Sequence, residues 1–225
     1  MIKMNRPRIN YKTNMQQRKF SEKLFVMETI RDLDEAIDQI CEAMSEEEKV
    51  DPFAEDLSPY FGILWPAAEA LSIFLSENSI LVKNKKVLEL GCGLGYPSMM
   101  ATHLGGHVLA TDYHPDVEFF FHRNCQHSVL QCDYKRFNWR ETEEDIGLFD
   151  VVMGSDILYE SKHAKEVARG LLRFVKPGGI ILLADPGRAY LQNFITAMNE
   201  LGYSEEFHSI SVKEKDIFLF KFLID

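Results

Sequence analysis

Short apolar runs and amphipathic segments alternate along most of the chain, which predicts strands and helices in turn. The apolar runs that predict buried strands are 86–90, 107–111, 128–132, 150–154 and 180–184. The segments with apolar positions at helical spacing are 67–75, 97–104, 116–126, 162–174 and 190–201. Near-continuous apolar strands alternating with helices are typical of a mostly parallel sheet covered on both faces.

The two ends of the chain depart from this alternation. The last two runs, 204–212 and 216–224, predict an antiparallel terminal hairpin. Apolar positions between residues 20 and 44 recur mostly at helical intervals and predict one long or two short amphipathic helices. The sequence therefore predicts a Rossmann-like α/β domain over residues 55–225, with a seven-stranded sheet, preceded by a charged helical extension over 1–54.

The charge of the chain is −10 and is unevenly distributed. Such a charge argues against non-specific binding to nucleic acid, because phosphates are repelled. Residues 1–23 hold seven Lys or Arg and one acid, whereas residues 28–56 hold twelve acids, including Glu46-Glu47-Glu48, and two bases. The acidic segment is either a solvated helix or a rim that steers a basic substrate.

The cysteines indicate a reducing compartment. There are four, with no C-x-x-C pair, and no secretory signal precedes them, so a cytoplasmic protein is expected. No apolar stretch approaches the roughly 18 residues that cross a bilayer, and no membrane association is expected. The histidines show no metal-ligand grouping, and metal binding is not expected.

The strand at 86–90 leads into the sequence E-x-G-x-G-x-G, formed by Glu89, Gly91, Gly93 and Gly95. Closely spaced glycines after a strand let the backbone approach a ligand, although such a turn can also be purely structural. A dinucleotide prefers G-x-G-x-x-G and bare N–H groups around its phosphates. The carboxylate of Glu89 would instead suit the sulfonium and ammonium of S-adenosylmethionine, so this cofactor is favoured over NAD.

Ligands of doubly wound sheets bind at the carboxyl ends of the strands. After the second strand come Asp112 and Tyr113, and Asp112 can accept hydrogen bonds from both ribose hydroxyls or can serve as a cap or loop carboxylate. After the third strand come Asn138 and Trp139, which could flank an adenine. A buried structural Trp139 is the alternative.

After the fourth strand come Ser155, Asp156 and Tyr159, where a transferred methyl group should meet its acceptor. The motif is D-x-x-Y and not the (N/D)-P-P-(Y/F) motif, which clamps a planar amide or exocyclic amine. Asp156 and Tyr159 are better matched to an amine and are the candidate catalytic residues, with Ser155 on the cofactor side. Their structural alternatives are a helix cap for Asp156 and a core position for Tyr159.

With these motifs, residues 55–223 resemble the class I, seven-β-strand S-adenosylmethionine-dependent methyltransferases. Within them the chain is similar to methyltransferase family 16, lysine methyltransferases often labelled nicotinamide N-methyltransferase-like. The segment Gly62–Ala68, which contains Trp65-Pro66, also resembles the family. The resemblance implies that Trp65 closes over the cofactor, Asp112 holds the ribose and Asn138-Trp139 border the adenine. Tyr96-Pro97 departs from the Leu-Pro common in the family.

The expected reaction is in-line methyl transfer to a nitrogen, leaving S-adenosylhomocysteine, with Asp156 orienting the amine and Tyr159 shaping its pocket. Three hypotheses remain open from the sequence. The first is a protein-lysine methyltransferase acting on a protein partner of basic character. The second is a methyltransferase for a small amine or a nicotinamide-like ring. The third is a cofactor-binding scaffold that has lost catalysis.

Overall fold

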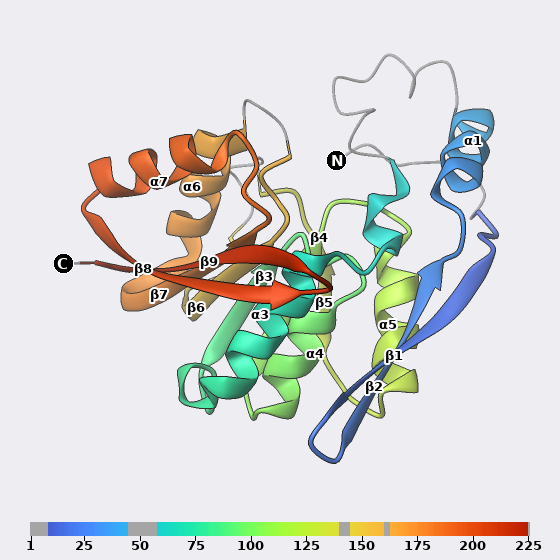
Figure 1. Cartoon of the computed structure of the whole chain (residues 1–225), viewed down its shortest axis with the longest axis horizontal. Coiled ribbons are helices and arrows are strands. Elements are labelled where there is room, and N and C mark those ends of the chain that lie inside the picture. The colour runs from blue at the N-terminus through green and yellow to red at the C-terminus, as the bar shows by residue number, and fades with distance from the viewer. Residues whose placement is uncertain (1–8, 45–57, 140–144, 160–162, 225) are drawn as a thin grey trace.

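The computed structural model describes residues 9–44, 58–139, 145–159 and 163–224, and its centre is a seven-stranded sheet. The strands are β3 (Lys86–Leu90), β4 (His107–Asp112), β5 (Asp133–Arg136), β6 (Phe149–Ser155), β7 (Val175–Asp185), β8 (Tyr203–Val212) and β9 (Lys215–Ile224). Their order is β5-β4-β3-β6-β7-β9-β8 (Figure 1). The first five strands in this order are parallel, and β9 and β8 are antiparallel. The predicted fold class is confirmed.

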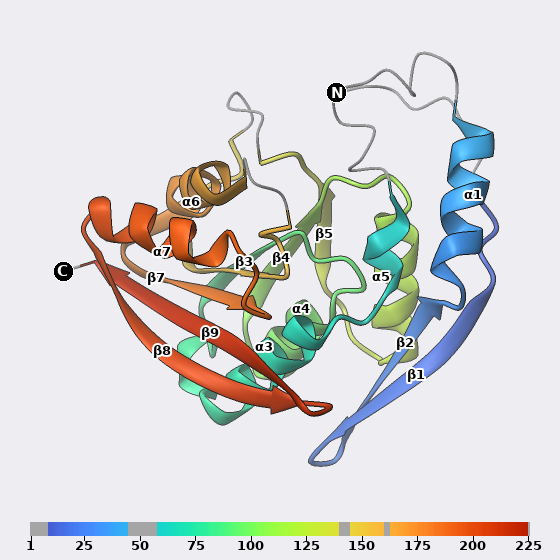
Figure 2. The same cartoon turned by 45° about the horizontal axis from the view of Figure 1, so that its top comes forward.

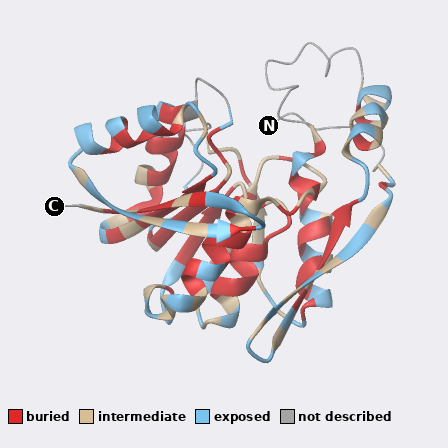
Figure 3. Cartoon of the chain, viewed as in Figure 1, coloured by how far each residue is buried: buried red, intermediate tan, exposed pale blue. Residues whose placement is uncertain are grey.

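Helices cover both faces of this sheet (Figure 2). They are α3 (Pro66–Glu77), α4 (Tyr96–His103), α5 (Val117–His127), α6 (His163–Phe174) and α7 (Leu191–Glu200). Alternate strand residues supply two apolar clusters: Val151 and Met153 pack with α3, α4 and α5, whereas Val152 packs with α6 and α7. Figure 3 shows the buried residues concentrated in the sheet and on the helix surfaces that face it.

The third predicted strand lies in the wrong place. Residues 128–132 form the turn that ends α5, and the strand follows at Asp133–Arg136. Val129 has a left-handed φ of 53° and is 84% exposed, and the amide of Leu130 donates back to the Cys125 carbonyl at 2.9 Å. The apolar run over 128–132 therefore reflects a helix terminus.

The first part of the predicted helical extension is also wrong. Residues 13–30 form the antiparallel hairpin β1 (Thr13–Phe20) and β2 (Lys23–Ile30), and only α1 (Leu33–Ala43) is helical. Phe25 and Met27 are fully buried while Leu24 is 44% exposed, which is the alternation of a strand in the first half of β2, and Met27–Ile30 are all buried. Asp32 accepts from the Glu35 amide at 3.1 Å and starts α1.

The hairpin packs on the main domain and shares its core. Phe25, Met27 and Ile30 belong to the same apolar cluster as α3, α4 and α5. The Glu28 amide donates to Asn124 Oδ1 at 2.7 Å, which ties β2 to α5. A Cβ on Gly62, at the end of the 3-10 turn η2 (Pro59–Gly62), would lie 2.3 Å from the Ile30 side chain. The hairpin therefore supports η2.

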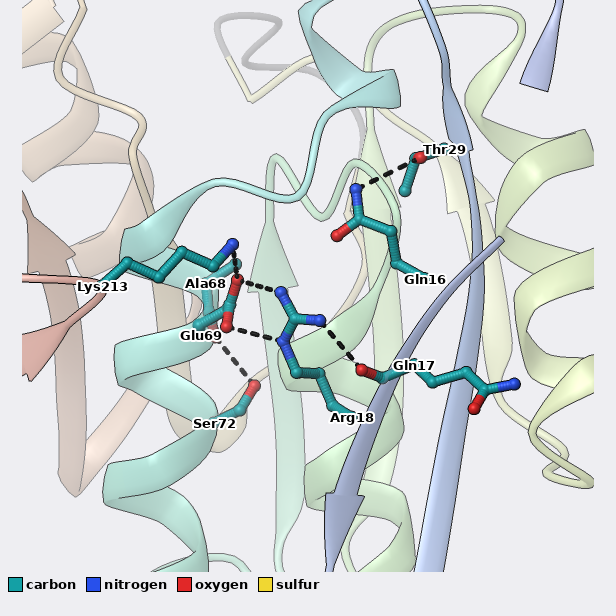
Figure 4. A network of polar contacts seen from close by, with 8 residues as sticks. All are labelled: Gln16, Gln17, Arg18, Thr29, Ala68, Glu69, Ser72 and Lys213. Carbon is teal, nitrogen blue, oxygen red and sulfur yellow. Dashed lines mark hydrogen bonds and ion pairs between the residues drawn. The ribbon is translucent and has the colours of Figure 1, made fainter. Parts of the chain in front are cut away.

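An ion-pair network joins three distant parts of the chain (Figure 4). Arg18 of β1 donates from two nitrogens to Glu69 of α3, at 2.6 and 2.7 Å. Lys213, in the turn between β8 and β9, lies 3.0 Å from the same carboxylate. Burial alone would raise the pKa of Glu69, but the hydrogen bonds from Arg18 and Lys213 lower it below its usual value. Glu69 therefore fastens both hairpins to α3.

Two acids in the described part of the acidic segment, Glu28 and Glu35, have structural partners. Glu28 lies 2.8 Å from Arg123 and accepts from the Thr13 hydroxyl, and Glu35 pairs with Lys12 at 2.5 Å. Glu46-Glu47-Glu48 lie outside the described residues, so steering of a basic substrate stays a prediction.

Among the described residues, no helix has the length and apolar character needed to cross a bilayer.

Candidate active site

A cavity of about 480 Å³ lies at the carboxyl ends of β3, β4 and β6, within the size range of small-molecule sites. Eleven of the twelve site residues singled out from the sequence line it; Glu89 does not. They are Trp65, Gly91, Gly93, Gly95, Asp112, Tyr113, Asn138, Trp139, Ser155, Asp156 and Tyr159. The fold therefore brings residues that are far apart in the chain together at the carboxyl ends of the strands.

The glycine loop supplies one wall of the cavity, and its conformation requires glycine. Gly91, Gly93 and Gly95 have φ values of 66°, 49° and 80°, all in the left-handed region. A Cβ on Gly95 would lie 2.4 Å from the Phe121 ring, and one on Gly91 would lie 2.8 Å from Ile157. Because these three residues have no side chain, the backbone of the tight turn is open to a ligand. Helix α4 begins directly after the turn.

Asp112 holds this loop in place. One of its carboxylate oxygens accepts from the Gly93 amide and the other from the His114 amide, both at 2.9 Å. Arg136 Nε donates to the Tyr113 carbonyl at 3.0 Å and fixes the next residue. Asp112 is therefore both the loop carboxylate of the structural interpretation and a residue that lines the cavity.

The predicted placement of Glu89 beside the ligand is wrong. Its side chain is fully buried, and Oε2 accepts from the amide (3.0 Å) and hydroxyl of Ser98, in the first turn of α4. Val87 and Glu89 point to the α4 face because side chains alternate along a strand. Burial raises the pKa of Glu89 to about 8, with the charge of Asp112 adding to it and Ser98 opposing it. Glu89 therefore carries little charge at neutral pH.

Two tryptophans border the cavity from different elements. Trp65 precedes α3, and its indole N–H donates to the Tyr60 carbonyl in η2 at 2.9 Å. Trp139 lies between the glycine loop and α6, since a Cβ on Gly91 or on Gly170 would lie about 3.5 Å from its ring. Trp139 is partly buried, so it packs against α6 and also lines the cavity.

The D-x-x-Y motif brings a buried carboxylate and a half-exposed phenol to the cavity. Asp156 has a left-handed φ of 63°, its amide donates to the Ala184 carbonyl at 2.9 Å, and its carboxylate forms an ion pair with Arg188. Because α6 begins at His163 and the carboxylate pairs with Arg188, the helix-cap interpretation is not supported. Tyr159 is 43% exposed, so the core interpretation is wrong.

Arg188 and His114 also line the cavity and were not singled out from the sequence. Arg188 belongs to the D-P-G-R turn that follows β7, so the same carboxyl-end rule could have found it. His114 follows Asp112 by two residues, and its Nδ1 accepts from the Asp116 amide at 3.1 Å. Its ring lies 4.4 Å from that of Phe61 in η2, which only the folded structure reveals.

Cys92, inside the glycine loop, is a packing residue. It is buried, and burial together with the charges of Asp112 and Glu89 raises the pKa of its thiol well above the usual value. A neutral, buried thiol is a poor nucleophile. Cys92 therefore fills space within the glycine loop.

Similar solved structures are methyltransferases. Precorrin-6y C5,15-methyltransferase from Geobacter metallireducens aligns with a TM-score of 0.59 at 19% identity, covering 70% of this chain and 88% of that one. Magnesium protoporphyrin IX methyltransferase from Synechocystis, with bound S-adenosylmethionine, aligns with a TM-score of 0.59 at 13% identity, covering 81% and 99%. At these identities the likeness concerns the fold alone.

Sequence relatives are lysine methyltransferases. The electron transfer flavoprotein beta subunit lysine methyltransferase of Xenopus laevis is 35% identical over 137 residues, 58% of this chain and 54% of that protein. Protein N-lysine methyltransferase METTL21A of Xenopus tropicalis is 28% identical over 127 residues, 54% and 59% of the two chains. The matched regions span little more than half the length of these relatives. A family model described as lysine methyltransferase matches residues 48–201, and the chain belongs to this family.

Proposed function

We propose that the protein transfers a methyl group from S-adenosylmethionine to the side-chain nitrogen of a lysine in a protein substrate. The observation that carries the proposal is the shared cavity, which Asp156 and Tyr159 line together with the glycine loop and Asp112. Membership of the lysine methyltransferase family supports the choice of acceptor. The cytoplasmic location and the domain boundary at residue 55 stay predictions.

The lining of the cavity fits this cofactor. At Gly93 a Cβ would lie 3.1 Å from the Phe61 carbonyl oxygen, so only glycine leaves the loop backbone open there. Among the described residues that line the cavity, the charged side chains are two acids, Asp112 and Asp156, and one base, Arg188; His114 is a further titratable group. Asp112 and the indoles of Trp65 and Trp139 would hold the ribose and the adenine. When bound, the cofactor supplies a methyl group already activated by its sulfonium.

The work left to the protein is to position an amine and to manage its proton. A lysine has a reference pKa of about 10.4 and must lose a proton before it can act as a nucleophile. Asp156 would accept a hydrogen bond from the amine and orient its lone pair. Burial in the cavity lowers the pKa of the acceptor lysine and favours the neutral amine. Tyr159, half exposed at the mouth, would contact the stem of the lysine side chain.

The test is transfer of labelled methyl groups into a cell extract that is then separated into protein and small-molecule fractions. Asp156→Asn is compared with Asp150→Asn, a matched variant at the other end of β6 whose carboxylate pairs with Lys176 at 2.9 Å. We expect label in a protein band with the wild type and Asp150→Asn, and none with Asp156→Asn. Label only in small molecules would contradict the proposal in favour of a small-amine acceptor.

A second measurement separates loss of chemistry from loss of folding. The affinity for S-adenosylhomocysteine, measured by calorimetry, should stay within about twofold of wild type in Asp156→Asn, since Asp112 and the glycine loop are untouched. Absence of label from every fraction despite normal affinity would indicate a scaffold without catalysis.

A further inference from the structure

Arg188 places a cation directly against the candidate catalytic carboxylate. Its guanidinium forms an ion pair with Asp156, and the same nitrogen, Nη1, lies 3.6 Å from Asp185 Oδ2. The Asp156 side chain is 7% exposed and that of Asp185 is fully buried, whereas Arg188 is 29% exposed. One cation is thus shared by two buried carboxylates.

The backbone around Arg188 is held in a fixed conformation. Asp185 Oδ1 accepts from the amides of Gly187 and Arg188, both at 2.8 Å. Gly187 has a φ of 88°, and a Cβ there would lie 2.7 Å from the Phe218 ring. The Asp156 amide donates to Ala184, the residue before Asp185. The loops after β6 and β7 are therefore tied together, and the side chains of Asp156 and Arg188 meet without rearrangement.

The charges around Asp156 oppose one another. Burial is the largest influence and raises the pKa of Asp156, the charge of Asp185 adds to it, and Arg188 opposes both. Tyr159 lies on the same loop as Asp156. The other titratable groups that line the cavity are Tyr60, Cys92, Tyr96, Asp112, Tyr113 and His114. Arg188 is the one Lys or Arg among the described residues that line this cavity.

We propose that Arg188 is a positioning residue that keeps Asp156 ionised and correctly oriented to receive the acceptor amine. This inference rests on the proposed function, because it assigns a task to Asp156 in amine methylation. Without the guanidinium, two buried carboxylates would face each other, and one of them would take up a proton. A protonated Asp156 could no longer accept a hydrogen bond from the amine with the same oxygen.

The experiment compares Arg188→Gln and Arg188→Lys with Lys176→Gln, a matched control that removes the ion pair between Asp150 of β6 and Lys176 of β7, at the opposite end of these strands. Three quantities are measured. The first is the affinity for S-adenosylhomocysteine, and the second is the pH profile of kcat/KM for the protein substrate. The third is the titration of the Asp156 carboxyl carbon by NMR, with the signal assigned by comparison with Asp156→Asn.

We expect Arg188→Gln to lower kcat/KM at pH 7 by about tenfold or more, and to move the acidic limb of the profile and the carboxyl titration upward by about one pH unit or more. Its affinity for S-adenosylhomocysteine should stay within about twofold. Arg188→Lys should recover most of the loss, and Lys176→Gln should match wild type. The retained affinity shows that the variants are folded.

Two results would overturn the inference. One is an unchanged titration of Asp156 and an unchanged acidic limb in Arg188→Gln. The other is a large loss of affinity for S-adenosylhomocysteine with an unchanged pH profile, which would assign Arg188 to the carboxylate of the cofactor. If the wild type methylates no protein, the proposed function fails, and the carboxyl titration still decides whether Arg188 controls Asp156.

Discussion

Glu89 should make the stability of this protein decrease as the pH rises, and Glu89→Gln should remove that dependence. In the folded chain the carboxyl group is fully buried, and burial raises its pKa from 4.5 to about 8. In the unfolded chain it is solvated and titrates at its ordinary value. Between these two pH values the folded chain therefore holds a proton that the unfolded chain has released.

The stability that comes from this group is complete below pH 4.5 and is lost as the pH rises through about 8. Each unit between the two pKa values corresponds to about 1.4 kcal/mol, so the free energy of unfolding should fall by at most about 5 kcal/mol over this range. Gln keeps an oxygen that can accept from the Ser98 amide but does not titrate. The variant should therefore lack this decrease.

Urea unfolding of wild type and Glu89→Gln at pH 5, 6, 7 and 8 would measure the effect. The difference in unfolding free energy between the two proteins should change by several kcal/mol in favour of Gln as the pH rises. A constant difference would refute the reasoning, because it would mean that Glu89 titrates alike in both states. Since Glu89 does not line the cavity, affinity for S-adenosylhomocysteine should change by less than about threefold.

Three further predictions concern the site and its supports. In Asp112→Asn one of the two side-chain oxygens that accept from the amides of Gly93 and His114 becomes an NH2 group, which is a donor facing another donor. Calorimetry should show the affinity for S-adenosylmethionine reduced by about tenfold or more. Gly95→Ala forces a Cβ onto Phe121 and should lower the free energy of unfolding by about 2–4 kcal/mol. Gly147→Ala is the control: Gly147 has a φ of 86° with nothing within 4 Å of an added Cβ, so the variant should lose only about 1 kcal/mol of unfolding free energy. Equal losses for Gly95→Ala and Gly147→Ala in urea unfolding would contradict the steric argument. Glu69→Gln removes the anion between Arg18 and Lys213 and should cost about 1–2 kcal/mol at pH 7. Because the pKa of Glu69 is lowered on folding, this cost in unfolding free energy should shrink as the pH falls through the pKa of Glu69 in the folded chain. A cost that persists in acid would contradict the ion-pair origin of the stabilisation.

The central sheet could be predicted from the sequence because buried parallel strands are short and almost continuously apolar. The cavity residues that follow β3, β4 and β6 could be predicted for the same reason, since the ends of these strands are easily located. Asn138 and Trp139 follow β5, which lies five residues later than predicted, and Trp65 was found through the family resemblance. Residues 20–30 were misassigned to a helix because Leu24, Met27 and Ile30 are spaced by three, which fits a helix, whereas the helical assignment holds for Leu33–Ala43. In the hairpin Phe25 and Met27, spaced by two, are fully buried, whereas Leu24 is 44% exposed. Tertiary burial against α5 decides between the two periods.

The contacts that determine charge could not be predicted in the same way. Glu89 was placed beside the ligand because it adjoins the glycines in sequence, yet strand alternation turns it toward Ser98. The pairing of Asp156 with Arg188 depends on the register of β6 and β7, which places Ser155 opposite Ala184. Sequence shows which strand ends meet, but it does not show which carboxylate is paired, buried or protonated.

These assignments determine the charge that a ligand meets. Glu89 holds its proton near neutral pH, Arg188 is one cation shared by Asp156 and Asp185, and Asp112 lines the cavity, so the net charge that a ligand meets is negative. S-adenosylmethionine carries a sulfonium, an ammonium and a carboxylate, a net charge of +1, whereas the product lacks the sulfonium charge. The electrostatic attraction thus favours the cofactor over its product. Asp112→Asn should therefore lower the affinity for S-adenosylmethionine more than the affinity for S-adenosylhomocysteine. Equal losses of affinity for the two ligands would show that Asp112 acts only by holding the glycine loop.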